Sequence, residues 1–240
     1  MLIRYWVTKM AKRPIFIATG KQDRLVEEIL VNFEWNPGFS SIQKKKNVAA
    51  LHESAKKRSL FPVLEISTKS EEKLGKRLSA FNLNLKTEIG EIALEAAYQG
   101  SKVFENGGPY TDIYKKDGLG AKTDERIRNS GGLVRFDYFG QEWPLNPKTA
   151  FYDWLYLCAL SPYQEYLKRL YNYVGFTDIE FNPQRSINCQ ARSCALLVSL
   201  LRLGWLDKAL RSQRGFIEVI SSGSISEDQS TEIRQGSLAV

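Results

Sequence analysis

Hydrophobic and polar residues alternate along the chain in a pattern that predicts an α+β fold in which helices predominate. Short apolar runs typical of strands occur at 14–20, 29–35 and 61–68. Apolar spacings of three and four residues predict helices over 41–59, 148–160, 163–174 and 187–204, and a last short helix that ends near Ile220. Residues 133–145 predict a hairpin around Gly140, and we expect little regular structure in 111–132 and 175–186.

Particular residues predict where one helix begins and where another ends. Asn146 and Pro147 predict an N-cap and a first helical position before the helix at 148–160. Gly204 predicts the end of the helix at 187–204.

A helix predicted over 91–104 carries a narrow polar stripe. Glu95, Gln99 and Lys102 have the spacing i, i+4 and i+7, which places them on one line along a helix. The polar sector covers roughly 80° at 100° per residue, whereas a surface helix has a broad polar face. We therefore expect an enclosed helix whose charged groups face a cleft. Spacing alone leaves open a peripheral helix whose stripe is its solvated edge.

The residue types in the stripe suit chemistry at a sugar. Burying a charge is costly unless the charge is paired or used. A carboxylate in a cleft can act as general acid or base, or stabilise an oxocarbenium-like centre. A desolvated lysine is a nucleophile and can form a Schiff base with a sugar aldehyde. Glu95 and Lys102 together are therefore consistent with cleavage at an anomeric carbon.

The length of 240 residues and the hydrophobic fraction of 43% allow a single domain with a real core. We expect residues 1–9 to be an optional extension and residues 10–220 to form the domain. Residues 221–240 are polar, serine-rich and free of aromatic residues, so they predict a disordered tail. No apolar run is long enough to cross a bilayer, so we expect no membrane contact.

The net charge of +7 suits an anionic partner, and the basic runs 44–46 and 56–58 slightly favour a polymeric anion. The three cysteines form no close pair, which predicts free thiols in a reducing cytoplasm and no zinc site. His52 is the only histidine and is interpreted as structural, so we expect neither a catalytic histidine triad nor a histidine-rich metal site.

Several segments resemble the NADAR family, named for NAD and ADP-ribose. "LSAFNL" contains Ser79 and Phe81, "EAAYQGSKVF" contains the polar stripe, and "FTDIEFNPQRSIN" contains Asp178, Glu180 and Asn188. Ala96 stands where many members have histidine, and "IEFNPQRS" replaces a glycine-rich loop. "GSKVFENGGPYTDIY" and "EWPLNPKTAFYDWLY" are similar to one branch, the NADAR antitoxins associated with DarT-type DNA ADP-ribosyltransferase toxins.

The resemblance implies a compact single NADAR-like domain with a few short strands. It implies a hydrolase, an ADP-ribosyl glycohydrolase that removes ADP-ribose from guanine and so reverses the toxin's modification. The implied partners are ADP-ribosylated single-stranded DNA, the product ADP-ribose and a cognate DarT-type toxin. No cofactor or metal is implied.

The resemblance also implies roles for residues. Glu95, Lys102 and Asp178 are the expected catalytic residues. Lys102 would attack the anomeric carbon or capture the opened ribose as a Schiff base, while Glu95 would move protons and stabilise positive charge. Asp178 and Asn188 would hold ribose hydroxyls or position water, with loop capping as the alternative. The expected substrate-binding residues are Ser79, Phe81, Gln99, Gly107, Gly108, Tyr110, Trp143, Trp154, Glu180 and Asn188.

Several of these residues could instead have a purely structural role. Each aromatic residue could instead belong to the core, and the glycine pair could be a plain turn. Three arginines are phosphate candidates or ordinary surface residues, namely Arg126, Arg128 and Arg135. Two other functions remain open, an N-glycosidase acting on a small nucleotide-like metabolite and a non-enzymatic module that binds ADP-ribose or nucleic acid.

Overall fold

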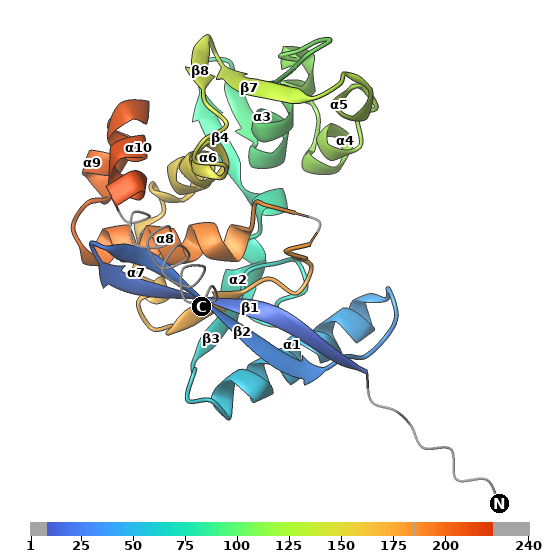
Figure 1. Ribbon diagram of the computed structural model, residues 1–240, viewed down its shortest axis with the longest axis vertical. Helices are drawn as coiled ribbons and strands as arrows, with labels where there is room; N and C mark the ends of the chain where they lie inside the picture. Colours follow the sequence, from blue (N-terminus) through green and yellow to red (C-terminus); the bar gives the residue numbers. More distant parts are fainter. Residues whose placement is uncertain (1–8, 185, 223–240) are drawn as a thin grey trace, which may run out of the picture.

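The computed structural model of the protein describes residues 9–184 and 186–222 (Figure 1). The extension predicted for 1–9 and the tail predicted for 221–240 lie outside these residues, except for Lys9, Ser221 and Ser222. Within the described part of the chain, no helix is both long and apolar enough to span a membrane.

A four-stranded sheet forms the lower part of the molecule in Figure 1. β1 (Met10–Lys21) and β2 (Arg24–Glu34) form an antiparallel hairpin, and they contain the strands predicted over 14–20 and 29–35, except for Trp35. β9 (Gly175–Thr177) pairs antiparallel with β1 and parallel with β3 (Val63–Glu65), which gives the order β2-β1-β9-β3. The strand β9 corrects the prediction of an irregular loop from residue 175, because a short segment between two strands is fixed by its neighbours rather than by its own sequence.

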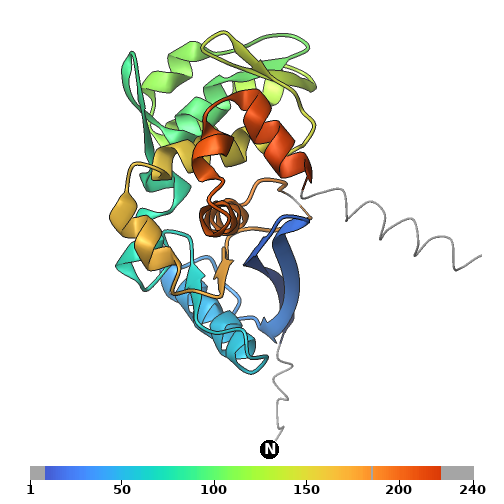
Figure 2. The ribbon, with the colours of Figure 1, turned by 90° about the vertical axis from the view of Figure 1, so that its left-hand side faces the viewer.

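The two faces of this sheet are covered by different helices, because successive side chains in a strand point to opposite faces. Ile15 and Val63 pack toward α1 (Ser41–Lys56), where Leu51 is fully buried, as its spacing predicted. The adjacent Phe16 and Leu64 belong instead to the larger core on the other face. Figure 2 views α8 (Gln190–Arg202) nearly down its axis, and this helix packs on β1, β2 and β9.

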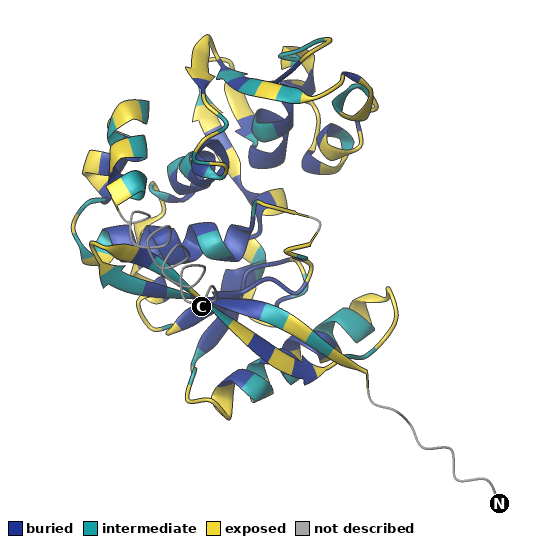
Figure 3. Ribbon diagram, in the orientation of Figure 1, coloured by how far each residue is buried: buried dark blue, intermediate teal, exposed yellow. Residues whose placement is uncertain are grey.

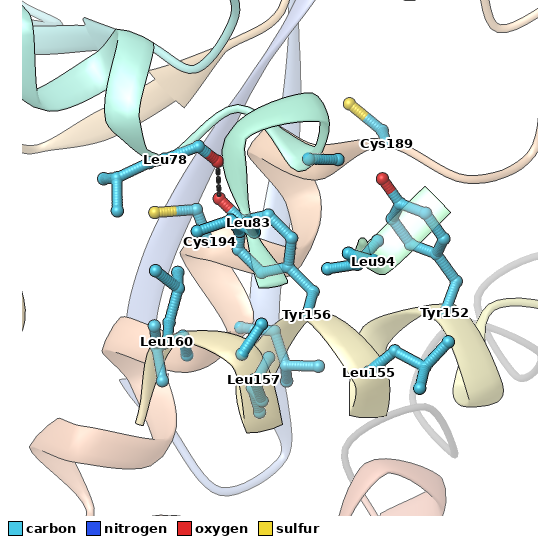
Figure 4. Packing of buried hydrophobic residues seen from close by; sticks show 14 of the residues in the cluster. Leu78, Leu83, Leu94, Tyr152, Leu155, Tyr156, Leu157, Leu160, Cys189 and Cys194 are labelled. Atoms are coloured by element: carbon cyan, nitrogen blue, oxygen red, sulfur yellow. Dashed lines mark hydrogen bonds between the residues drawn. The ribbon is translucent and has the colours of Figure 1, made fainter. Parts of the chain in front are cut away.

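The larger core lies where α8 meets α6 (Ala150–Leu160), and both helices are dark blue along most of their length in Figure 3. The hydroxyl of Tyr156 donates a hydrogen bond to the carbonyl of Leu78 at 2.8 Å inside this core (Figure 4). The bond satisfies a polar group that would otherwise be costly to bury. Shorter helices surround the core, namely α2 (Lys73–Arg77), η1 (Ala80–Asn82), α7 (Gln164–Leu170), α9 (Leu206–Leu210) and α10 (Gln213–Ser222).

The upper part of the molecule is built around α3 (Leu94–Gly100). A small hairpin precedes it, formed by β4 (Asn84–Thr87) and β5 (Gly90–Ala93). The sheet β6-β7-β8 follows, with β6 (Lys102–Phe104), β7 (Leu133–Tyr138) and β8 (Gln141–Trp143). Between β6 and β7 the chain forms η2 (Thr111–Lys115), α4 (Gly118–Lys122) and α5 (Arg126–Asn129).

The structure corrects three sequence predictions in this region. The helix predicted over 91–104 is helical only from Leu94 to Gly100, because its ends pair with β4 and β7. Residues 111–132 contain three short helical segments where little regular structure was predicted. The helix predicted from Asn146 and Pro147 begins at Ala150, whose N–H donates to the Pro147 carbonyl at 3.0 Å. The hairpin around Gly140 and the α+β class are confirmed, although strands take a larger part than predicted.

Trp143 provides a test of the larger core, because its side chain is fully buried against the rings of Phe151 and Trp154. We expect Trp143→Ala to lower the free energy of unfolding by about 3–5 kcal/mol, measured by urea denaturation. Phe39→Ala is the control, because Phe39 is 98% exposed, and it should change stability by at most about 0.5 kcal/mol. A loss below about 1 kcal/mol for Trp143→Ala would contradict its place in the core.

Candidate active site

The helix α3 is enclosed on nearly all sides, as the narrow polar stripe predicted, although it is shorter than predicted. Small residues allow this close packing. A Cβ added to Gly100 would lie 2.6 Å from the Tyr114 ring, and one added to Gly118 of α4 would lie 3.3 Å from the Cβ of Glu95. The neighbouring elements therefore press directly against the helix that carries the stripe.

The three residues of the stripe meet, but not on one helix. Glu95 and Gln99 are each only 6% exposed, and the Gln99 Nε2 donates to the Glu95 Oε1 at 2.7 Å. Lys102 lies in β6, where its Nζ is 4.8 Å from the centroid of the Tyr98 ring, a cation–π distance. All three line a pocket of about 330 Å³, which we call the lysine pocket.

A second pocket of about 540 Å³, the aspartate pocket, adjoins the lysine pocket. The predicted site residues Phe81, Asp178 and Glu180 line it. Glu95 and Asn188 line both pockets, so the two cavities share a wall. Each volume lies within the range of roughly 300–1,000 Å³ typical of small-molecule sites.

Asp178 follows β9 directly and is held by two donors. Its Oδ1 accepts from the Glu180 backbone N–H and its Oδ2 accepts from the Gln190 Nε2, each at 3.0 Å. Burial and the nearby negative charge of Glu65 raise the pKa of Asp178. Ser79 lies behind the pocket, where its hydroxyl and the Ala80 N–H donate to the Oε1 of Gln190 at 3.4 and 2.7 Å.

The lysine pocket contains two buried acceptors that have no hydrogen-bond partner among the described residues, the Oδ1 of Asn188 and the Oε1 of Gln99. The other polar atom of Asn188 is used, since its Nδ2 donates to the Tyr98 hydroxyl at 2.6 Å. An unpaired buried polar atom costs about 1–3 kcal/mol, and both atoms belong to side chains that line the lysine pocket.

The amine of Lys102 loses its proton more readily than the amine of an exposed lysine. Burial lowers the pKa of Lys102 to about 8; the charge of Glu95 opposes this shift and the charge of Lys122 adds to it. At pH 7, roughly one lysine in ten is then a neutral amine, which is the nucleophilic form. Among the described residues, no group of three or more His, Cys, Asp or Glu side chains is arranged to hold a metal ion.

Comparison of the sequence with models of known protein families identifies the family of this chain. A family model described as the DarT1-associated NADAR antitoxin matches residues 11–230. The chain belongs to this NADAR antitoxin family. The resemblance found in the sequence is thus confirmed, and no curated protein sequence matches the chain significantly.

Six of the residues expected in this NADAR protein's site line neither pocket, namely Ser79, which lies behind the aspartate pocket, and the five described next. Trp143 and Trp154 pack against each other in the core at 5.0 Å between ring centroids, because their large apolar rings are better buried. Gly107, Gly108 and Tyr110 form the turn after β6. Added Cβ atoms at the two glycines would lie 2.2 Å from the Tyr110 hydroxyl and the Lys102 carbonyl, so these glycines permit close packing.

Two of the three phosphate-candidate arginines are engaged in ion pairs. Arg126 bonds to Asp112 and Asp124, and Arg135 bonds to Glu142. Arg128 is exposed and lines the aspartate pocket.

Sequence reasoning missed several residues that line the pockets, among them Lys122, Tyr152, Tyr98 and Gln190. Lys122 comes from α4, which was predicted to be irregular, and it lines both pockets. Tyr152 comes from an apolar helix in which no feature separates it from core residues, and Tyr98 comes from α3 itself. Gln190 is part of the "NCQAR" stretch, where a polar residue at the start of an apolar helix was the available signal.

The shifted pKa of Lys102 can be measured by ¹³C-methylating the lysines and following the NMR signals with pH. We expect one signal, absent from Lys102→Arg, to titrate near pH 8. Glu95→Gln should move that titration to lower pH because it removes an attractive charge, and Lys122→Met should move it to higher pH because it removes a repulsive one. Titration near 10.4, the ordinary lysine value, would show that the amine is solvated.

Proposed function

We propose that this NADAR family member is an ADP-ribosyl glycohydrolase that removes ADP-ribose from guanine in DNA and so acts as an antitoxin to a DarT-type toxin. The observation that carries the proposal is the meeting of Glu95, Lys102 and Asp178 on two adjoining pockets. The family match over residues 11–230 supports the antitoxin role.

The proposed reaction divides between the two pockets. The neutral amine of Lys102 attacks the anomeric carbon of the ribose, while the bond from that carbon to the guanine nitrogen breaks. The carboxyl of Asp178, protonated because its pKa is raised, gives its proton to the departing nitrogen. Glu95 takes the proton from the attacking amine. Water then attacks the anomeric carbon and gives a proton to the Asp178 carboxylate, while Glu95 returns its proton to the departing lysine nitrogen and ADP-ribose is released. Capture of the opened ribose as a Schiff base would use the same neutral amine.

The pocket surroundings support a nucleotide substrate. Lys122 lies over the Phe81 ring with its Nζ 5.3 Å from the centroid, and exposed Arg128 lies on the same pocket. An aromatic face beside cations suits the stacking of a base and the neutralisation of phosphate. Leu119, which is 66% exposed, adds an apolar contact at the same pocket.

An oligonucleotide ADP-ribosylated on guanine tests the proposal. We expect the wild-type protein to release ADP-ribose, and Lys102→Ala and Glu95→Gln each to lower the rate at least about 100-fold while the fold is retained. Lys168→Ala is the matched control, because the Lys168 side chain is 73% exposed on α7 and should keep full activity.

The other possible functions give different results in the same assay. Release of a sugar from free nucleotides alone would indicate an N-glycosidase of small metabolites. Tight binding of ADP-ribose with no release from any substrate would indicate a binding module. Near-wild-type rates for Lys102→Ala would contradict the catalytic assignment.

A further inference from the structure

We propose that Glu65 is a positioning residue for Asp178. Glu65 hydrogen-bonds to the residues on either side of Asp178 in the chain, and the charge of Glu65 acts on the Asp178 carboxyl. This inference rests on the proposed function, in which Asp178 supplies a proton. Glu65 lies at the end of β3, is 1% exposed and lines neither the lysine pocket nor the aspartate pocket.

The alternation of side chains in β9 explains how Glu65 reaches the site without touching the substrate. Phe176 points to the α8 face of the sheet, whereas Thr177 points to the α1 face, where its hydroxyl lies 2.9 Å from the His52 Nε2. Asp178 turns back to the α8 side and meets Gln190, and Ile179 packs on the α1 side. Glu65 is therefore on the face opposite to the Asp178 carboxyl.

Glu65 holds both neighbours of Asp178 from that opposite face. Its Oε2 accepts from the Thr177 hydroxyl at 2.7 Å, and its Oε1 accepts from the Ile179 N–H at 2.9 Å and from the Ser67 hydroxyl at 2.6 Å. These bonds bracket Asp178 in the chain. They fix the backbone from which its side chain projects into the aspartate pocket.

A purely structural role does not account for a carboxyl at this place. The pairing of β3 with β9 and the bond from the Ile66 N–H to the Thr177 carbonyl at 2.7 Å already join the two segments. A glutamine would accept the same bonds from the Ile179 N–H and the Ser67 hydroxyl without the cost of burying an ionisable group. Such a cost is typical of functional sites, where it is retained because the group is used.

Glu65 and Asp178 also interact through their charges. Burial raises the pKa of both carboxyls, and the negative charge of Glu65 raises the pKa of Asp178 further. Glu180 adds to both shifts, and Arg13 of β1 acts on Asp178 in the opposite sense. Burial lowers the pKa of His52 to about 4, so His52 is neutral near pH 7. Asp178 also interacts with Tyr152, Tyr156 and Cys189.

The pH dependence of turnover separates the two parts of the role. Turnover falls at high pH as Asp178 loses its proton. Glu65→Gln keeps the shape of the side chain. Its amide N–H can donate to the Thr177 oxygen when the Thr177 hydroxyl donates instead to the neutral His52 ring. We expect kcat of this variant at its optimum to stay within about tenfold of wild type, while the high-pH limb moves down by about one pH unit because a repelling charge is gone.

Glu65→Ala removes the hydrogen bonds to Ser67, Thr177 and Ile179 as well as the charge. We expect kcat to fall at least about 100-fold, toward the level of Asp178→Asn, with KM changed less than about threefold because the pocket walls remain. Glu71→Gln is the matched control. Glu71 lines the same small cavity of about 120 Å³ as Glu65, but it is exposed, so this variant should keep the wild-type pH profile.

Each outcome decides the proposal. A wild-type pH profile for Glu65→Gln, or wild-type kcat for Glu65→Ala, overturns the role of Glu65 while leaving the proposed function standing. Absence of turnover in the wild-type protein overturns the proposed function, and this inference falls with it. If Glu65→Ala does not fold by circular dichroism, the profile of Glu65→Gln alone decides.

Discussion

Buried carboxyl groups impose the constraint on which this structure depends. Four of these carboxyls are at most 8% exposed and need hydrogen-bond donors to offset the cost of burial, namely Glu65, Glu95, Asp153 and Asp178. Asp153 of α6 is compensated fully, by an ion pair with Arg192 and a bond from the Ser193 hydroxyl at 2.5 Å, both on α8. That cluster fixes the central helix pair and is explained by stability alone.

The carboxyls at the candidate site are compensated differently. Within the described part of the chain, neither Glu65 nor Asp178 has an ion-pair partner, and both rely on hydroxyl, amide and backbone donors. Such donors leave the pKa of each group raised, whereas an arginine would lower it. The fold therefore holds the Asp153 carboxylate in an ion pair between α6 and α8, whereas Glu65 and Asp178 keep a high proton affinity at the candidate site. A high proton affinity is what a general acid needs near neutral pH.

The sequence predicts the residues of the site better than it predicts their arrangement. Glu95, Gln99 and Lys102 were placed on one helix, yet the helix ends at Gly100 and Lys102 belongs to a strand. Their convergence survives because β6 leaves α3 within two residues and pairs with β7, so Lys102 stays beside Tyr98. Local spacing cannot reveal such a reversal, since the pairing partner lies about thirty residues away and propensity is overridden by tertiary contacts.

Other parts of the fold show the same limit. Long amphipathic runs such as α1 and α8 were predictable because their apolar spacing matches the surface that they cover. The strand β9 and the pocket residues Lys122 and Tyr152 were not, because their roles come from segments that are distant in the chain. The role of Glu65 was not predictable for the same reason, because its bonds to Thr177 and Ile179 join residues more than a hundred positions apart.

We propose that Lys102 faces a pocket that binds ADP-ribose, and protection of this lysine by the ligand is a direct test. Lysines of the intact protein are labelled by reductive methylation with and without ADP-ribose, and the extent at each lysine is measured by mass spectrometry. The account predicts that ADP-ribose protects Lys102 strongly and leaves exposed Lys168 unchanged. Equal labelling of Lys102 with and without saturating ADP-ribose would contradict it.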